Sequence, residues 1–248
     1  MIYNTLKELS MAGVCWELSE ESLKQDVKQK PIQQTFKTNQ SKTENVVIVP
    51  PTAPITLDTV KSMVERPDTI EALVRMVGEF NHPLRSGATN VVLPNIAETP
   101  NVLLIITDFP SSDDDLSGRI LSGNAGEMVD KMLSAIEMSR KNVSILPLLF
   151  WRTPGGRTPT REELDLSMPF VDKMIKMLNP RVIITFGTLA TTEIAKSNLN
   201  DAHGKEITDD NGCKIIPMYH PNYLILKPSA KRDVWDALQN VQKLLKNV

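Results

Sequence analysis

The chain has 248 residues, of which 41% are hydrophobic and 23% are charged, and its formal net charge is -2 at pH 7. This length allows one sizeable α/β domain with an appendage. The near-neutral charge excludes nucleic-acid binding through overall positive charge, so any polyanion has to meet a local basic patch. The two cysteines, Cys15 and Cys213, exclude a disulfide framework and a cysteine-held zinc or iron–sulfur site.

The first quarter of the chain differs in composition from the rest. Apolar residues between Leu6 and Leu18 are spaced roughly as one face of a helix, which predicts an N-terminal helix over 1–25. A polar segment rich in Gln, Lys, Thr and Asn then runs into the Pro-rich "VIVPPTAPITL", which predicts a flexible linker over 26–66. We therefore expect the compact domain to span 67–248.

Short apolar runs alternate with segments of helical periodicity from residue 67 onward. This alternation is typical of parallel strands joined by crossover helices. Strands are predicted over 102–108, 143–150, 181–187 and 213–220. Helices are predicted over 68–80, 125–138, 160–178, 189–197 and 229–247.

The loop "TDFPSSDDD" follows the first strand. Ligands of open parallel sheets bind beyond the carboxyl ends of the strands, so this loop and the three that follow the other strands are expected to share one cleft. Asp108 lies at the strand end among apolar neighbours, where a carboxylate can orient a water or stabilise a cationic sugar transition state. Asp113, Asp114 and Asp115 are expected to form a turn, because most aspartate runs do so.

The loop "YHPNYLILKP" follows the fourth strand. His220 is fixed there by Pro221, and its imidazole can donate to charge that develops on a leaving group. A histidine that merely caps the strand is the alternative. Lys227, Lys231 and Arg232 lie close by in the sequence and predict a patch that contacts a phosphate backbone.

The loop "WRTPGGRTPTREEL" follows the second strand and places Arg152 and Arg157 around a Pro-Gly-Gly turn. Two guanidiniums and the backbone amides of the turn can hold a phosphate. A turn with solvated arginines is equally natural. Thr160 and Glu163 have the spacing of a capping box for the next helix.

Taken together, the loops resemble those of the uracil-DNA glycosylase superfamily, in particular its thermostable-type branch, family 4. The blocks "TDFPSSDDDLSGRILSGNAG", "LPLLFWRTPGGRTPT", "FGTLA" and "HPNYLILKPSAKRDVW" stand in the order and at the spacing of the family's own blocks. The resemblance implies a three-layer α/β/α sandwich with a central four-stranded parallel sheet. It also implies an enzyme that flips a base out of DNA and hydrolyses its N-glycosidic bond.

Carried over position by position, the resemblance implies catalytic roles for Asp108 and His220. The base pocket that it implies consists of Phe109, Pro110, Ser111, Leu121 and Pro147.

Three of these pocket positions depart from the family's pattern. Ser111 stands in place of a glycine, Leu121 in place of the aromatic that stacks on the base, and Pro147 in place of the asparagine that reads the uracil edge. Leucine gives up stacking, and proline has neither a side-chain amide nor a backbone N–H. We therefore expect ordinary uracil excision to be impaired.

The cysteines that hold a 4Fe–4S cluster in many family members correspond to Glu79, His82, Trp151 and Ser167. The resemblance therefore predicts that the cluster is absent and that no metal is bound. The turn His82-Pro83-Leu84 keeps the shape of the family's Cys-Pro-Leu turn, and its imidazole is expected to pack rather than to bind a metal.

Two classes of function stay open at this point. The first is a DNA glycosylase that uses Asp108 and His220. The second is a catalytically inactive glycosylase fold that binds a protein partner through its N-terminal helix, or binds DNA through Arg152, Arg157, Lys227, Lys231 and Arg232. An α/β scaffold unrelated to DNA fits the matched spacing of the four blocks poorly.

The predicted partner is thus DNA, single- or double-stranded. Charged residues interrupt the N-terminal apolar positions, and no run of 18 apolar residues occurs in the chain, so the sequence predicts a cytoplasmic protein with no membrane contact.

Overall fold

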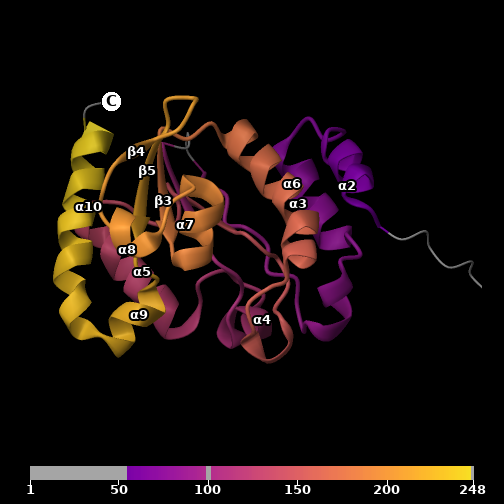
Figure 1. The fold of residues 1–248 in the computed structure, drawn as a ribbon, viewed down its shortest axis with the longest axis horizontal. Helices are drawn as coiled ribbons and strands as arrows, with labels where there is room; N and C mark the ends of the chain where they lie inside the picture. Colours follow the sequence, from indigo (N-terminus) through magenta and orange to yellow (C-terminus); the bar gives the residue numbers. More distant parts are fainter. Residues whose placement is uncertain (1–54, 99–101, 247–248) are drawn as a thin grey trace, which may run out of the picture. The chain divides into compact units, whose positions relative to one another are not determined.

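The structure is a computed structural model that describes residues 55–98 and 102–246. These residues belong to a compact unit that spans Ala53–Val248 (Figure 1). The helix predicted over 1–25 lies outside the described residues, as does most of the predicted linker.

The last part of the predicted linker is helical. Helix α2 spans Leu57–Val64 and buries Val60 and Val64. Thr56 caps it by accepting a hydrogen bond from the backbone N–H of Thr59 at 3.3 Å. The compact unit therefore begins before Pro67, because the apolar residues of "LDTVKSMV" recur at helical spacing and find a core to pack against.

The elements after α2 alternate between strands and helices, as the sequence predicts. The strands are β1 (Leu103–Thr107), β2 (Ser144–Pro147), β3 (Val182–Phe186), β4 (Ile207–Thr208) and β5 (Lys214–Met218). The α-helices are α3 (Ile70–Glu79), α4 (Ser112–Ser117), α5 (Gly123–Ala135), α6 (Arg161–Leu178), α7 (Thr188–Ala195), α8 (Leu199–Ala202), α9 (Pro221–Leu226) and α10 (Lys231–Lys246). Single 3₁₀ turns are η2 (Pro83–Gly87), η3 (Pro154–Gly156) and η4 (Pro228–Ala230).

The described residues contain one five-stranded sheet in the order β2-β1-β3-β5-β4. The pairs β1 with β2, β1 with β3 and β3 with β5 are parallel, which confirms the predicted sheet of four parallel strands. Strand β4 differs from the prediction, since it adds a short antiparallel edge to β5. Two residues are too few to produce a recognisable strand pattern.

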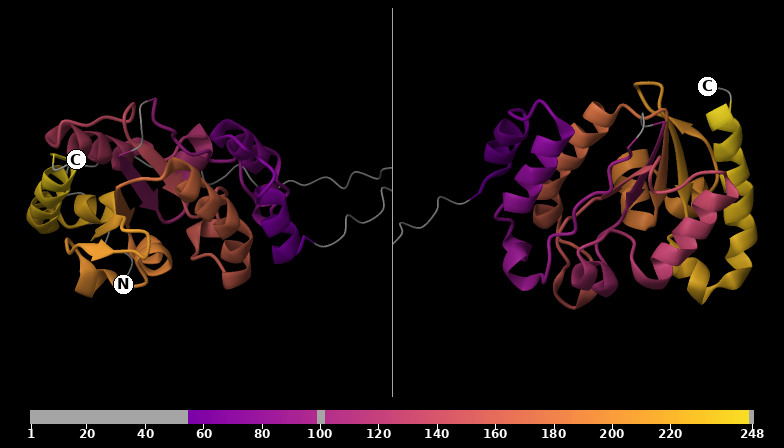
Figure 2. Two further views of the ribbon diagram at one scale, coloured as in Figure 1. Left: turned by 90° about the horizontal axis from the view of Figure 1, so that it is seen from above. Right: turned by 180° about the vertical axis from the view of Figure 1, so that it is seen from behind.

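Helices cover both faces of this sheet (Figures 1 and 2). Alternate residues of β1 point to opposite faces: Leu104 and Ile106 join a core cluster with residues of α2, α3 and α6, whereas Leu103 and Ile105 join a second cluster with residues of α5 and α10. Every residue of β1 is buried. This arrangement is the three-layer α/β/α sandwich that the resemblance implied.

An aromatic cluster fixes the loop after β2 against α6. Trp151 is fully buried and stacks on His82, with ring centroids 4.4 Å apart and an interplanar angle of 3°. Phe80 lies 5.9 Å from Trp151 and 5.1 Å from Phe170 of α6. The Nε1 of Trp151 has no hydrogen-bond partner in the part of the chain that the structure describes, so packing alone holds the ring.

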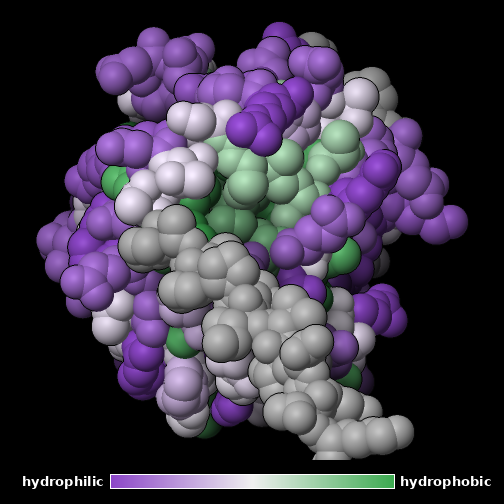
Figure 3. Space-filling view, turned by 90° about the vertical axis from the view of Figure 1, so that its right-hand side faces the viewer, coloured by the Kyte–Doolittle hydropathy of each residue, from purple (hydrophilic) through white to green (hydrophobic). Residues whose placement is uncertain are grey.

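Helices α2 and α3 lie together on the α6 side of the molecule. The apolar side chains Met63 of α2 and Val74 of α3 are partly buried against the core. The face that these helices present shows an apolar area bordered by hydrophilic residues (Figure 3). No helix among the described residues is long and apolar enough to cross a membrane.

Trp151→Ala should lower the free energy of unfolding by about 3–5 kcal/mol, because it leaves a cavity where a fully buried ring was stacked. Trp151→Phe should cost clearly less than Trp151→Ala, since it keeps an aromatic ring, leaves a smaller cavity and removes an N–H that has no partner in the described structure. Urea unfolding measures both values. The matched control is Leu226→Ala, at a side chain that is 85% exposed, and it should change stability by less than about 0.5 kcal/mol. Equal losses in the two Trp151 variants would contradict this account.

Candidate functional site

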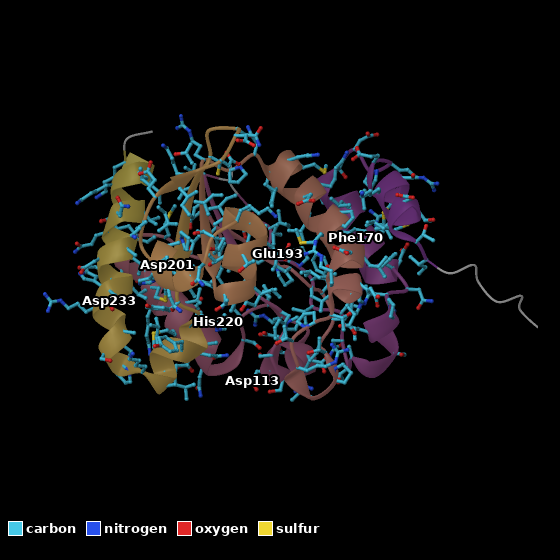
Figure 4. All side chains as sticks on the ribbon, viewed as in Figure 1. Asp113, Phe170, Glu193, Asp201, His220 and Asp233 are labelled. Carbon is cyan, nitrogen blue, oxygen red and sulfur yellow. The ribbon has the colours of Figure 1, made fainter. Side chains whose placement is uncertain are left out.

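A pocket of about 240 Å³ lies at the carboxyl ends of the parallel strands. Figure 4 shows His220 on this side of the molecule, above Asp113 of α4. The pocket is lined by Asp108, Phe109, Pro110, Ser111, Ser112, Asp114, Leu121, Ala125, Arg152, Gly156, His220 and Asn222. The structure therefore brings together the loops after β1, β2 and β5. The loop after β3, which the sequence placed in the same cleft, contributes no residue to this lining and instead contacts Asp108 through Gly187 and Ala190.

Asp108 directly follows β1 and is held by the first turn of α7. Its Oδ1 accepts a hydrogen bond from the backbone N–H of Ala190 at 2.7 Å. Gly187, at φ 100°, lies against the carboxylate so closely that a Cβ at this position would overlap its oxygens. Burial raises the pKa of Asp108 to about 6, although the backbone N–H groups of Ala190 and Leu189 act in the opposite direction.

His220 is the N-terminal capping residue of α9. Its Nδ1 accepts a hydrogen bond from the backbone N–H of Asn222 at 3.2 Å. Burial lowers the pKa of His220 to about 4, against the negative charge of Asp114, which raises it. The ring is therefore neutral at pH 7, and because Nδ1 accepts, its proton lies on Nε2. The histidine is a neutral hydrogen-bond donor.

The three consecutive aspartates form the first turn of α4 rather than an open loop. Ser111 and Asp114 make a capping box, in which the Ser111 side chain accepts from the Asp114 N–H and the Asp114 carboxylate accepts from the Ser111 N–H. Asp115 is buried and accepts from the N–H groups of Thr89 and Asn90 at 2.8 and 3.0 Å. Asp113 alone of the three is exposed. Asp114 and Asp115 thus hold loops together.

Leu121 reaches the pocket in a strained backbone conformation, with φ at 49°. Arg140 holds it there, because its guanidinium donates to the carbonyl oxygens of Ile120 and Leu121 at 2.8 and 2.6 Å. Asp130 accepts from Nε of the same arginine at 2.6 Å. The sequence gives no signal for this role of Arg140, because no motif joins it to Leu121.

The two arginines of the Pro-Gly-Gly loop have different surroundings. Arg157 is exposed and pairs with Glu163 through both of its terminal nitrogens, one of them at 2.8 Å. Arg152 is half-buried and lines the pocket. Its Nε is buried without a hydrogen-bond partner among the described residues, and no ion pair in that part of the chain includes it.

The other predicted site residues lie outside the lining of the pocket. Pro147 is buried at the end of β2, an edge strand, where it lies opposite Thr107. Lys227, Lys231 and Arg232 are exposed at the end of α9 and the start of α10. The Lys227 ammonium lies 5.7 Å from the centre of the Tyr223 ring.

The residues at the four positions that the resemblance assigns to cluster cysteines do not fit a 4Fe–4S cluster. Both ring nitrogens of His82 are engaged: Nε2 donates to the carbonyl oxygen of Glu163 at 2.9 Å, and Nδ1 accepts from the N–H of Leu84 at 3.1 Å. Trp151 has no ligating atom, and the hydroxyl of Ser167 donates to the carbonyl oxygen of Leu148 at 2.7 Å. Such clusters require thiolates.

The rest of the described chain offers no alternative metal site. Its cysteine, Cys213, is half-buried, and burial raises the pKa of this thiol to about 11. No group of three or more His, Cys, Asp or Glu side chains with metal-binding geometry occurs within residues 55–98 and 102–246.

Comparisons with known proteins agree with the motifs. The model of the uracil DNA glycosylase superfamily matches residues 95–240. The Type-4 uracil-DNA glycosylase of Thermotoga maritima is 28% identical over 169 residues, which cover 66% of this chain and 88% of that protein. The Type-4 uracil-DNA glycosylase of Archaeoglobus fulgidus is 26% identical over 172 residues, 65% of this chain and 85% of that protein. The Type-4 uracil-DNA glycosylase of Pyrobaculum aerophilum is 28% identical over 158 residues, which cover 60% of this chain and 80% of that protein.

The raised pKa of Asp108 should appear in the pH dependence of stability. Since the folded state favours the protonated carboxyl, ionisation of Asp108 disfavours folding as pH rises through the interval between its unfolded pKa of 3.8 and its folded pKa of about 6. Asp108→Asn removes this effect and still accepts from Ala190. The variant should therefore gain up to about 3 kcal/mol relative to the wild type between about pH 4 and about pH 7. Urea unfolding across that range measures the difference in the free energy of unfolding between the variant and the wild type. A difference that does not change with pH would contradict the raised pKa of Asp108.

Proposed function

The chain belongs to the uracil DNA glycosylase superfamily, and we propose that it is a DNA repair glycosylase that hydrolyses the N-glycosidic bond of a flipped, deaminated base. The observation that carries the proposal is the pocket in which Asp108 and His220 lie together at the strand ends. The names of the similar proteins, Type-4 uracil-DNA glycosylase, support the same substrate class. The proposed setting is the cytoplasm, and the proposed partner is DNA.

In this reaction the bond between C1′ of the deoxyribose and the ring nitrogen of the base breaks. The electron pair of that bond leaves with the base, which becomes an anion, while the sugar gains oxocarbenium character. A water oxygen then forms a new bond to C1′ and gives up a proton. The base anion takes up a proton, which balances the one lost by the water, so that the products are the free base and an abasic site in the DNA.

Asp108 suits the role of the group that orients this water and takes its proton. A general base is most effective when its pKa lies near the working pH, and burial brings the pKa of Asp108 to about 6. Its negative charge also stabilises positive charge on the sugar. Because Ala190 and Gly187 fix the carboxylate, little reorganisation is needed at the moment of reaction.

His220 suits the stabilisation of the departing base. Its Nε2–H can donate to an exocyclic oxygen on which negative charge develops. Because the ring is neutral at pH 7, the pocket needs no anion to balance a positive charge on His220. Donation from a neutral, preorganised imidazole removes part of the barrier without transferring the proton.

The exposed cations near α9 suit contacts with the DNA backbone. Lys227, Lys231 and Arg232 are exposed in a short stretch of sequence that begins near the pocket residue Asn222. Together they supply the local positive charge that the overall charge of the chain does not. Arg157 contributes less, because Glu163 already pairs with it.

We further propose that ordinary uracil excision is impaired. Ser111, Leu121 and Pro147 depart from the residues that the family resemblance assigns to these positions. Leu121 lines the pocket but cannot stack on a base, and Pro147, which lies outside the lining, has no amide with which to read a base edge. A second candidate function follows from the same three residues: a glycosylase fold without catalysis that binds DNA, or that binds a protein partner through residues 1–25.

Single-turnover excision from oligonucleotides that carry uracil, hypoxanthine or xanthine tests the proposal. The rate should rise with pH and level off above about pH 6, because Asp108 has to be ionised and His220 stays neutral. Asp108→Asn should lower the rate by about 10²–10⁴-fold and abolish the inflection near pH 6. His220→Ala should lower the rate by about 10²-fold or more and leave the inflection in place.

The outcome separates the two candidate functions. Excision that depends on both residues supports the glycosylase. Absent excision together with salt-sensitive DNA binding establishes the inactive binder, and a rate that falls as pH rises would contradict the assigned roles. Asp236→Asn on α10, exposed and outside the pocket, is the matched control for loss of a carboxylate charge.

Leu226 is a candidate residue for base flipping that sequence reasoning missed. Its side chain is 85% exposed at the end of α9, next to Lys227 and in the helix that His220 caps. An exposed apolar side chain beside a phosphate-binding cation can fill the gap that a flipped base leaves in the stack. The sequence could not single it out, because Leu226 belongs to the apolar run Leu224-Ile225-Leu226, of which Leu224 is buried.

Leu226→Ala should therefore reduce excision from double-stranded DNA by about tenfold or more, while excision from single-stranded DNA stays nearly unchanged, because only a duplex has to be unstacked. Leu116→Ala is the matched control, since Leu116 is also exposed, at 72%, but lies on α4. Equal effects of Leu226→Ala on both substrates would exclude the wedge role.

A further inference from the structure

Leu121 forms part of the wall of the pocket that holds Asp108 and His220. Its φ of 49° lies in the left-handed region, which is unfavourable for a leucine and persists only where the surrounding structure imposes it. The contacts that impose this conformation therefore also decide where this part of the pocket wall lies.

A second hollow, of about 270 Å³, adjoins the same segment. Leu121 lines this hollow as well as the pocket, and Gly126 and Arg140 line it too. Packing thus does not enclose Leu121 on every side. The backbone of the segment therefore has to contribute to fixing the wall, and the hydrogen bonds to that backbone are what hold it.

Arg140 binds both of the peptide groups that flank Leu121. Its guanidinium donates to the carbonyl oxygen of Ile120 at 2.8 Å and to that of Leu121 at 2.6 Å. Because each peptide group is a rigid plane, the conformation of Leu121 depends on two rotations between these two planes. A planar guanidinium that binds both planes restricts both rotations, which the single ammonium of a lysine cannot do with the same fixed geometry.

Three further contacts support this arrangement. Asp130 of α5 accepts from Nε of Arg140 at 2.6 Å and so orients the guanidinium. On the other side of the segment, Asp114 accepts from the backbone N–H of Ser122 at 2.6 Å and from its hydroxyl at 2.9 Å. Gly126 lets α5 approach closely, because a Cβ there would overlap one of the carbonyl oxygens that Arg140 binds. The segment is therefore held from α4, from α5 and by Arg140.

We infer that Arg140 is a positioning residue: by fixing the peptide groups on both sides of Leu121, it holds the wall against which a flipped base packs. This inference rests on the proposed function and adds to it a residue outside the lining of the pocket. From that position, Arg140 acts on the base through Leu121. Loss of its guanidinium should therefore weaken binding of the flipped base and leave the chemistry at Asp108 and His220 in place.

A contribution to stability alone is the competing role of Arg140. Its carbonyl oxygen accepts from the side-chain amide of Asn95 at 2.8 Å, so the residue also belongs to the packing after α5. A purely structural role would lower thermal stability and leave the kinetics of the folded protein unchanged. A positioning role would raise the protein concentration that gives the half-maximal rate and leave the maximal rate nearly unchanged, because an apolar wall contacts the base before and during the reaction alike.

The experiment uses the full chain with Arg140→Met, which removes every donor, and Arg140→Lys, which keeps the charge but loses the planar fork. Asp130→Ala is a milder variant that keeps the guanidinium and removes the carboxylate that orients it. Lys141→Met, at the exposed neighbouring position, is the matched control for a lost charge. Arg140→Met is also combined with Leu121→Ala. Single-turnover excision from single-stranded oligonucleotides that carry uracil, hypoxanthine or xanthine is measured over a range of protein concentrations, and thermal unfolding confirms that each variant is folded.

Arg140→Met should raise the protein concentration at the half-maximal rate by about tenfold, with a change in the maximal rate of less than about threefold. Arg140→Lys and Asp130→Ala should give smaller rises, and Lys141→Met none. In the Leu121→Ala background, Arg140→Met should cause no further rise, because its effect passes through the side chain that is already lost. An equal rise in both backgrounds, or a fall in the maximal rate alone, would overturn the inference and leave the proposed function standing.

A second readout does not depend on catalysis. A residue with a positive φ holds its amide hydrogen close to its α-hydrogen, so the nuclear Overhauser effect between these two hydrogens of Leu121 should be strong in the wild type and in Lys141→Met. It should weaken in Arg140→Met, whose Leu121 is free to leave the left-handed region. An unchanged effect in Arg140→Met would overturn the inference whatever the excision rates. A weakened effect in a protein without excision would support the positioning of the wall by Arg140 and overturn the proposed function alone.

Discussion

The register of the parallel sheet is the constraint on which the site depends. Thr107 lies opposite Pro147 in β2 and opposite Phe186 in β3, and Phe186 lies opposite Met218 in β5. Strands aligned in this way end at the same edge, so the segments that follow them emerge side by side. Asp108, Arg152, Gly187 and His220 come from four such segments. A shift of one residue in any pair would move a side chain of the site to the opposite face.

Burial at this edge acts on the two titratable residues in opposite directions. It favours the neutral form of each, which raises the pKa of Asp108 and lowers that of His220. Each residue also accepts a hydrogen bond from the first turn of a helix, Asp108 from α7 and His220 from α9. One physical cause thus produces a carboxylate poised near neutral pH and an imidazole that donates without charge, which fits the division of roles proposed for the hydrolysis.

The sequence predicts what depends on local pattern and misses what depends on distant partners. Apolar runs predicted the parallel strands, and strand-end positions predicted that Asp108, Arg152 and His220 meet. Helix α4 was missed, because "SSDDDLS" has the composition of a turn, and only the capping box and the buried contact of Asp115 with Asn90 make it helical. The residues next to Arg152 and Arg157 in the sequence do not show which of the two arginines is paired. Glu163, in the first turn of α6, pairs with Arg157. The position of Pro147 outside the pocket lining also depends on tertiary packing.

Several positions that depart from the family resemblance have acquired structural roles in this chain. Ser111, in place of a glycine, caps α4, and its backbone N–H is held by Asp114. Where the resemblance places cluster cysteines, His82 and Trp151 stack, and Ser167 ties α6 to the loop after β2. This packing joins three segments that are distant in the sequence. Since Arg152 directly follows Trp151, the same aromatic stack also fixes the main chain beside a residue that lines the pocket.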